Sequence, residues 1–456
     1  MALISLNPAT NKVIKKYYVH EDLEIKKILE SGLKSQKYWS RLELGKRLEP
    51  VLQMSSYLKD NNLELSKMIT QEMGKPLKQS ILEIDKCADL CDYYNKNSTK
   101  ILADIDYKID GQKSFVSYQP LGLILGIMPW NFPFWQVFRF AIPCLIVGNG
   151  ALLKHSSNVQ GCAKLIEKSF RMVGFPKNIF KNIVIPGSKV SEIIKNPSIA
   201  AVSLTGSNKV GISVATDAAS VLKKTVLELG GSDPYIILSD ADLNQSAESC
   251  INGRILNAGQ SCISAKRIIV IDTIYDQFLE ILLKKLSKKK IGDPMTDVDL
   301  GPMVSLNARD EIHKQVLESV KKGAKIIMGG YISKSIGSYY PLTLLSNVKP
   351  GMPAFDDELF GPVFSIIKAN NDKDAIALAN LSEFGLGASV FTKDIIRGED
   401  IAKNKIFSGS CFVNDFVKSD PRLPFGGIKQ SGYGRELASH GMLEFVNIKT
   451  IVIKSN

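Results

Sequence analysis

The chain has 456 residues, of which 45% are hydrophobic and 23% charged, the balance of a globular protein long enough for two or three domains. This composition excludes a disordered chain, and the formal net charge of +12 comes from Lys and Arg residues spread along the whole sequence. We therefore expect no nucleic-acid partner, because the basic residues form no single stripe. The seven cysteines are too scattered for a disulfide framework and indicate reduced thiols, as in the cytoplasm.

The first hundred residues are predicted to be helical. Residues 22–97 carry apolar residues at helical spacing, such as Val51, Met54 and Leu58, and Pro76 interrupts the run. Residues 101–118 then alternate in polarity around the pair Asp-Gly at positions 110 and 111, which is typical of a β-hairpin.

The next apolar stretch resembles a membrane span. Residues 114–153 contain a single charged residue, Arg139, but eight prolines and glycines interrupt them. A spanning helix needs about 20 consecutive apolar residues and tolerates few such breaks. We expect buried strands joined by tight turns instead, and no membrane partner.

Short apolar runs alternate with helical stretches from here to the end of the chain, and the pattern restarts near residue 230. The expected strands are residues 121–128, 151–154, 183–185, 200–204, 235–238, 267–271, 325–328, 364–368 and 388–391. The expected helices are residues 161–173, 190–195, 243–257, 275–289, 306–322 and 372–382. This alternation favours parallel sheets covered on both faces. Residues 447–453 resemble an edge strand that could pair with another subunit.

A search for nucleotide-binding motifs gives one candidate. The fingerprint G-x-G-x-x-G is absent, but residues 204–211 read as a strand that ends in a glycine turn, Gly206-Ser207, before a helix. Such a helix N-terminus offers free N–H groups to a phosphate. An ordinary strand-to-helix turn explains the pattern equally well.

A glutamate and a cysteine form a sharper pattern. Glu228 opens the motif Glu-Leu-Gly-Gly, and Cys262 closes the motif Asn-Ala-Gly-Gln-Ser-Cys, 34 positions later. Pro-Trp-Asn-Phe-Pro at residues 129–133 and Glu-Leu-Phe-Gly-Pro at residues 358–362 flank this pair. With these motifs in order along nearly the whole chain, the sequence resembles the aldehyde dehydrogenase superfamily.

The resemblance assigns the chemistry to three residues. An aldehyde loses hydride readily only after a thiolate has added to its carbonyl, and Cys262 is the expected nucleophile, in surroundings that favour the thiolate. The amide of Asn131 and the backbone N–H of Cys262 would hold the resulting alkoxide. Glu228, beside Leu227 and Leu229, would be the poorly solvated base that hydrolyses the thioester. Read alone, Asn131 could be a turn residue and Glu228 a surface carboxylate.

The cofactor contacts also follow from the resemblance. We expect a nicotinamide dinucleotide to be bound by Trp130, Lys154, Ser157, Gly206, Ser207, Gly211, Leu229, Glu358 and Phe360. Lys154 would hold the adenosine ribose, and Glu358 the nicotinamide ribose. Members that prefer NAD often carry a glutamate at the position of Ser157, which repels a 2′-phosphate. We therefore expect NADP to be preferred and NAD also to be accepted.

The substrate prediction rests on Arg139. It lies eight positions after Asn131, so on one helix both would face the same pocket, where an arginine suits a carboxylate. This position, and residues 418–427, resemble the short bacterial and archaeal succinate-semialdehyde dehydrogenases, in which Trp135 and Ser419 would complete the pocket. A structural ion pair for Arg139 is the alternative. At the level of function, the alternatives are another short aldehyde, such as glyceraldehyde, and a catalytically silent structural relative.

These inferences give an α/β protein with three parts. Residues 1–98 and 121–229 would form a Rossmann-like cofactor domain, and residues 230–427 an α/β catalytic domain. Residues 99–120 and 428–456 would form a small β oligomerisation arm and tail, which favours a homodimer or homotetramer. No metal is expected, because the four histidines are far apart in the sequence.

Overall fold

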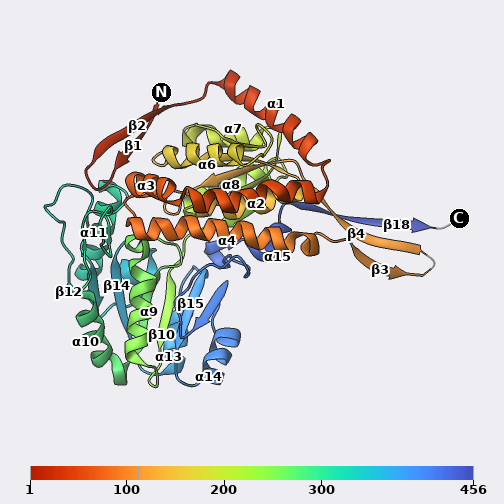
Figure 1. Cartoon of the computed structure of the whole chain (residues 1–456). Helices are drawn as coiled ribbons and strands as arrows, with labels where there is room; N and C mark the ends of the chain where they lie inside the picture. The colour runs from red at the N-terminus through yellow and green to blue at the C-terminus, as the bar shows by residue number, and fades with distance from the viewer. Residues whose placement is uncertain (1, 111, 455–456) are drawn as a thin grey trace.

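The computed structural model describes residues 2–110 and 112–454. It is an α/β fold with two large, mainly parallel sheets, as predicted (Figure 1). The N-terminal region begins with an unpredicted hairpin of β1 (Ala2–Asn7) and β2 (Lys12–Tyr18). The predicted helical run follows as α1 (Asp22–Trp39), α2 (Leu44–Asp60), α3 (Asn62–Met73) and α4 (Leu77–Ile101). The break predicted at Pro76 lies between α3 and α4.

The first sheet has six strands in the order β17-β9-β8-β5-β6-β7, parallel except for β17. Its strands are β5 (Leu123–Met128), β6 (Gly150–His155), β7 (Phe180–Asn182), β8 (Ile199–Thr205), β9 (Lys224–Glu228) and β17 (Gly432–Tyr433). The helices between them are α5 (Trp135–Val147), α6 (Gln160–Met172), α7 (Val190–Lys195) and α8 (Asn208–Ala219).

Two predictions in this region are wrong. The strand expected at residues 183–185 is β7, three residues earlier, and the apolar stretch expected to form only strands contains the helix α5. All 13 residues of α5 are buried. A helix buried on every side has no polar face, so the helical period is missing from its sequence. Among the described residues, no helix combines the length and apolar character needed to cross a bilayer.

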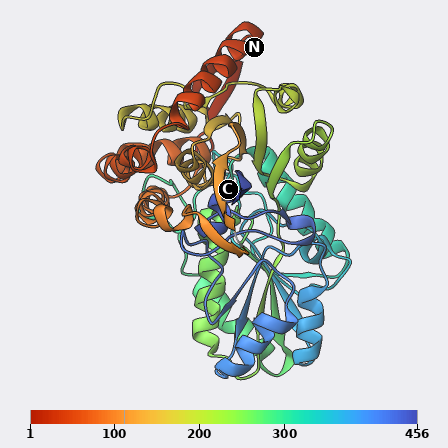
Figure 2. The same cartoon turned by 90° about the vertical axis from the view of Figure 1, so that its right-hand side faces the viewer.

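The second sheet has seven strands in the order β12-β13-β14-β11-β10-β15-β16, parallel except for β12. Its strands are β10 (Asp233–Ile237), β11 (Ala265–Ile271), β12 (Lys325–Met328), β13 (Thr343–Ser346), β14 (Val363–Ala369), β15 (Gly387–Phe391) and β16 (Ser410–Val413). The helices of this half of the chain are α9 (Leu243–Ile255), α10 (Tyr275–Leu286), α11 (Leu306–Lys321), α12 (Pro353–Asp356), α13 (Asp372–Asn380), α14 (Ile395–Asp400) and α15 (Ala438–Met442). Figure 2 shows the strands of this sheet flanked by helices.

A third, three-stranded sheet projects from the body of the molecule (Figure 1). It consists of β3 (Ile105–Ile109), β4 (Gln112–Pro120) and β18 (Val446–Lys454), all antiparallel. The predicted hairpin is confirmed, although Gly111 of its turn lies outside the described residues. The predicted edge strand is also confirmed, because β18 pairs with β4 along its length and leaves its other side open.

Candidate active site

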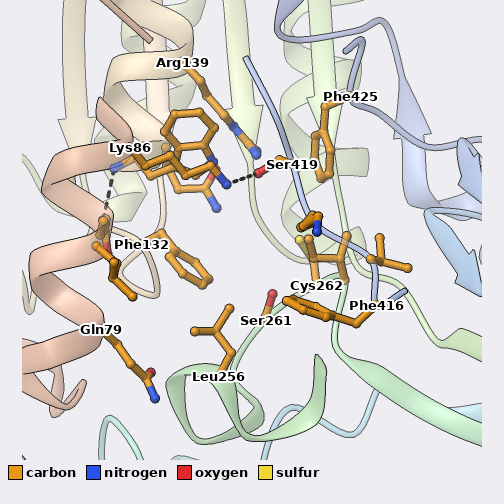
Figure 3. A pocket seen from close by; sticks show the side chains of 17 residues that line it. Gln79, Lys86, Phe132, Arg139, Leu256, Ser261, Cys262, Phe416, Ser419 and Phe425 are labelled. Carbon is orange, nitrogen blue, oxygen red and sulfur yellow. Dashed lines mark hydrogen bonds between the residues drawn. The ribbon is translucent and has the colours of Figure 1, made fainter. Parts of the chain in front are cut away.

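Cys262 lies where two cavities meet. The first cavity is bounded by residues that precede α5, residues at the ends of β8 and β9, and the loop before β14; its lining includes Trp130, Asn131, Gly206, Ser207, Leu229, Glu358 and Phe360. The second, of about 220 Å³, lies between α4, α5 and the loop after β16 (Figure 3). Among the described residues, only Cys262 and Gln136 line both cavities. A group bound in either cavity therefore reaches the same thiol.

The loop before Cys262 has an unusual backbone. Asn257, Ala258 and Gly259 all have positive φ, at 54°, 53° and 74°, a conformation that costs energy for the two residues with a side chain. The Asn257 side chain donates to the Asn131 carbonyl at 2.8 Å, and a Cβ on Gly259 would collide with the Gly361 carbonyl. Close packing thus holds the loop in a strained path that ends at the thiol.

Lys266 ties the same loop to the first cavity. Its ammonium donates to the carbonyls of Ser261 at 2.8 Å and Cys262 at 2.6 Å, and lies 3.3 Å from a carboxylate oxygen of Glu358. Glu358 also accepts from the backbone N–H of Gly231 at 3.1 Å. One buried cation therefore links the loop that carries Cys262 to Glu358. No sequence motif indicated Lys266, which is four residues after Cys262.

The surroundings of Cys262 do not favour the thiolate. Burial raises the pKa of the Cys262 thiol to about 12, although Arg139 and Lys266 act to lower it. The prediction of a thiolate-favouring site is therefore wrong, because desolvation outweighs the two cations. The thiol needs a base to take its proton when it reacts.

Glu228 is a buried carboxylate at the end of β9. Neither of its oxygens has a hydrogen-bond partner within residues 2–110 and 112–454. Burial, reinforced by the nearby Glu436, raises the pKa of Glu228 well above its ordinary value. Glu228 is therefore poorly solvated, as predicted. Its negative charge also raises the pKa of Cys262. A carboxyl in this state can accept a proton near neutral pH.

Asn131 lies in the first cavity beside Cys262. Its amide nitrogen donates to the Gln260 carbonyl at 3.1 Å, which leaves one amide hydrogen for another acceptor. The prediction that Asn131 and Arg139 share one helix is wrong, since α5 begins only at Trp135. Glu83 determines this start, because its carboxylate accepts from the backbone N–H groups of Phe134 and Trp135. The two residues consequently line different cavities.

Six of the predicted cofactor residues line the first cavity, and Lys154, Ser157 and Gly211 lie outside its lining. Gly206 and Ser207 precede α8, and a Cβ on Gly206 would meet only the Leu204 side chain, so a large group can approach this backbone. A Cβ on Gly211 would press on Leu229, which shows why a glycine suits this contact between helix and strand. Phe360 lies edge-on to Trp130, with ring centroids 5.8 Å apart.

Lys154 lies on β6, and Ser157 follows in the turn after this strand. Lys154 is partly buried on β6, and its ammonium makes no ion pair or hydrogen bond within the described part of the chain. Ser157, in the turn after β6, is partly exposed. Lys154 and Leu204 are both in register with Ile127 of β5, so Lys154, the turn with Ser157 and the N-terminus of α8 lie at the same edge of the sheet. A cation, a hydroxyl and free backbone N–H groups at one edge suit the ribose and phosphates of a dinucleotide.

The second cavity holds all three predicted substrate residues, Arg139, Trp135 and Ser419. Arg139 is less available to bind a ligand than the sequence suggested. It forms a buried ion pair with Glu436 and lies over the Phe425 ring at 4.8 Å. The structure adds Lys86, whose ammonium donates to Ser419 at 2.7 Å. Sequence reasoning missed Lys86 because it is one of many helical lysines.

Arg139→Ala is expected to destabilise the protein by about 3–5 kcal/mol, because the Glu436 carboxylate would stay buried without its partner. Thermal and urea unfolding measure this loss. The double variant Arg139→Met, Glu436→Gln, which removes both charges, is the matched control and should recover much of the stability. Equal losses in the single and double variants would contradict this account.

Comparisons with known proteins agree with this geometry. The model of the aldehyde dehydrogenase family matches residues 2–451. A probable succinate-semialdehyde dehydrogenase (NADP+) of Synechocystis sp. is 43% identical over 99% of this chain and 100% of its own. A succinate semialdehyde dehydrogenase (NAD(P)+) of Escherichia coli is 41% identical over 98% of this chain and 97% of its own. The structure of succinic semialdehyde dehydrogenase from Streptococcus pyogenes in complex with NADP+ superposes with a TM-score of 0.97, at 35% identity and full coverage of both chains. The chain belongs to the aldehyde dehydrogenase family.

Proposed function

We propose that this protein oxidises succinate semialdehyde to succinate, with NADP as the preferred and NAD as an accepted cofactor. The observation that carries the proposal is the position of Cys262, between a cavity suited to a dinucleotide and a cavity with cationic walls. The relatives named above, from Synechocystis sp. and Streptococcus pyogenes, support both the substrate and the cofactor.

The residues around the two cavities account for the chemistry. The Cys262 sulfur adds to the aldehyde carbon, and the thiol proton leaves to Glu228. The carbonyl oxygen becomes an alkoxide, which the free amide hydrogen of Asn131 stabilises; one such donor contributes roughly 2.7–4 kcal/mol. A bound nicotinamide would supply the acceptor for the hydride that leaves this carbon. Loss of the hydride would leave the acyl group on Cys262 as a thioester.

Hydrolysis completes the cycle. Glu228, once it has released its proton to solvent, takes a proton from water, and the hydroxide adds to the thioester carbon. The carbon–sulfur bond breaks, the carboxylate leaves, and the sulfur recovers a proton. A buried carboxylate with a raised pKa suits both proton transfers. Without such a base the acyl group would remain on the sulfur.

Kinetic measurements on the purified protein test the proposal. Succinate semialdehyde and butanal are compared with NADP and with NAD, by following the reduced nicotinamide. The proposal expects the highest kcat/KM for succinate semialdehyde with NADP. A higher kcat/KM for butanal, or for glyceraldehyde, would reject the proposed substrate.

Ser157→Glu is expected to lower kcat/KM for NADP at least about tenfold, because a carboxylate beside a 2′-phosphate costs more than the 1.4 kcal/mol that a tenfold change requires. The value for NAD should change less, since its 2′-hydroxyl can donate to the new carboxylate. Ser287→Glu, at an exposed position just after α10, is the control for added charge. An unchanged NADP value would show that the 2′-phosphate lies elsewhere.

We assign residues 1–98 and 121–229 to cofactor binding, residues 230–427 to catalysis, and residues 99–120 and 428–456 to subunit contacts. The projecting sheet of β3, β4 and β18 supports the last assignment, because Ile105, Tyr107, Ile448 and Val452 are exposed on it. We infer a homodimer or homotetramer, which a monomeric mass in light scattering would reject.

The seven cysteines are all free thiols, which suits a reducing compartment such as the cytoplasm.

A further inference from the structure

Three cations, Arg139, Lys86 and Lys418, line the substrate cavity, and they differ in how their charge is balanced. Lys418 forms an ion pair with Asp415 at 2.6 Å. Arg139 is almost fully buried and already paired with Glu436. Lys86 forms no ion pair within residues 2–110 and 112–454. The two carboxylates whose charge acts on Lys86 are engaged elsewhere: Glu83 with Lys75 and two backbone N–H groups, and Asp420 with Arg422. The positive charge available to a ligand in this cavity is therefore that of Lys86.

The contacts of Lys86 leave room for an anionic acceptor. Its ammonium donates to the Ser419 oxygen and lies 4.4 Å from the centroid of the Trp135 ring (Figure 3). An ammonium has three donors, and the Ser419 hydroxyl hydrogen is free to donate, because its oxygen is the acceptor in this contact. Both groups can then bind one carboxylate.

A second, independent observation comes from Trp135. Its side chain is buried in the wall of the same cavity, and its indole N–H has no acceptor in the part of the chain that the structure describes. A buried donor without a partner typically costs about 1–3 kcal/mol. The cavity thus contains an unsatisfied donor, a free hydroxyl hydrogen and an uncompensated cation on adjacent side chains.

We propose that Lys86, rather than Arg139, supplies the charge that selects aldehydes with a distal carboxylate, with Ser419 as the second donor. This inference rests on the proposed function, which it deepens by naming the selecting residue. Arg139 then acts as a structural cation that balances Glu436 next to the buried Glu228. The thiol of Cys262, on the opposite wall in Figure 3, faces the aldehyde end of the same molecule.

Lys86→Met tests the proposal, because methionine keeps an unbranched side chain and removes the charge. We expect KM for succinate semialdehyde to rise at least about tenfold, equivalent to 1.4 kcal/mol. The kcat for this substrate and both parameters for butanal should change little. Lys86→Arg should recover part of the lost affinity. Lys100→Met, which removes an exposed lysine from the last turn of α4, is the matched control.

The pH dependence gives a readout that a structural role would not produce. Burial, with Arg139 on α5, lowers the pKa of Lys86 to about 8, while Cys87, Asp420 and Glu83 act to raise it. The ammonium loses its proton as pH rises through this value. KM for succinate semialdehyde should therefore increase above about pH 8 in the wild type and stay flat in Lys86→Met. KM for butanal should be flat in both.

Inhibition by succinate separates this inference from the proposed function. Succinate should inhibit butanal oxidation by the wild type, and Lys86→Met should weaken that inhibition at least about tenfold. An unchanged KM and inhibition constant in a folded variant would overturn the role of Lys86 alone. Equal KM increases for butanal and succinate semialdehyde would also overturn it. A wild type with no preference for succinate semialdehyde would instead reject the proposed function.

Discussion

Cys262→Ala is expected to abolish aldehyde-dependent reduction of NADP, with a loss in kcat of at least about 10⁴-fold. The loss is large because the hydride cannot leave the aldehyde carbon before a nucleophile has added to it. No other cysteine can replace Cys262, since of the seven thiols it is the one that lines the two cavities. The rate of formation of reduced nicotinamide measures the effect.

Cys411→Ala is the matched control, because this partly buried thiol lies on β16 and outside both cavities. It should retain the wild-type rate. The Cys262 variant should unfold at the wild-type Tm and still bind NADP, as followed by protein fluorescence. Turnover above one thousandth of the wild-type rate in a folded Cys262→Ala protein would contradict nucleophilic catalysis by this residue.

Glu228→Gln is expected to lower steady-state turnover by about 10²–10⁴-fold. The substitution keeps the shape of the side chain and removes the base that activates water. Because the thiol proton of Cys262 also goes to Glu228, the first step should slow as well, and reduced nicotinamide should form without a burst. Mass spectrometry of the quenched protein should then find little acyl group on Cys262.

The wild type should show the corresponding pH dependence. Burial and Glu436 raise the pKa of Glu228, so its basic form becomes populated only as pH rises through that elevated value. Turnover should therefore increase with pH in the wild type, and the turnover of Glu228→Gln should lack this increase. Glu248→Gln, on the surface of α9, is the control. A wild-type pH profile in Glu228→Gln would assign the base to another residue.

The sequence identified much of the fold because its local signals were strong. The helices α1 to α4 follow from apolar periodicity, and most strands of both sheets follow from short apolar runs between glycines and prolines. The signal failed at α5, where every residue is buried and the period is lost. It also failed at short strands such as β13 and β16, whose pairing depends on neighbours distant in sequence.

The order of four short motifs along the chain was enough to identify the residues around the thiol. Glu228, Asn131 and Cys262 were predicted from four short motifs. The structure places Cys262 and Asn131 on one cavity, and Glu228 is buried next to Leu229, which lines the same cavity. Each motif is contiguous in the sequence, so its residue types are visible without knowledge of the fold. The variants of Cys262 and Glu228 test the roles proposed for these two residues.

The tertiary structure alone decided how the charges are balanced. Arg139 pairs with Glu436 almost 300 positions later in the chain, and Lys86 contacts Ser419 more than 300 positions later. Lys266 of β11 lies beside Glu358, which precedes β14. A sequence shows which side chains carry charge, but the free energy of a buried charge depends on its partners and its desolvation. The same dependence reversed the expectation for the Cys262 thiol, whose burial outweighs the two cations beside it. The sequence determined which residues are available for the chemistry, and the packing of distant segments determined which of their charges remain free to act.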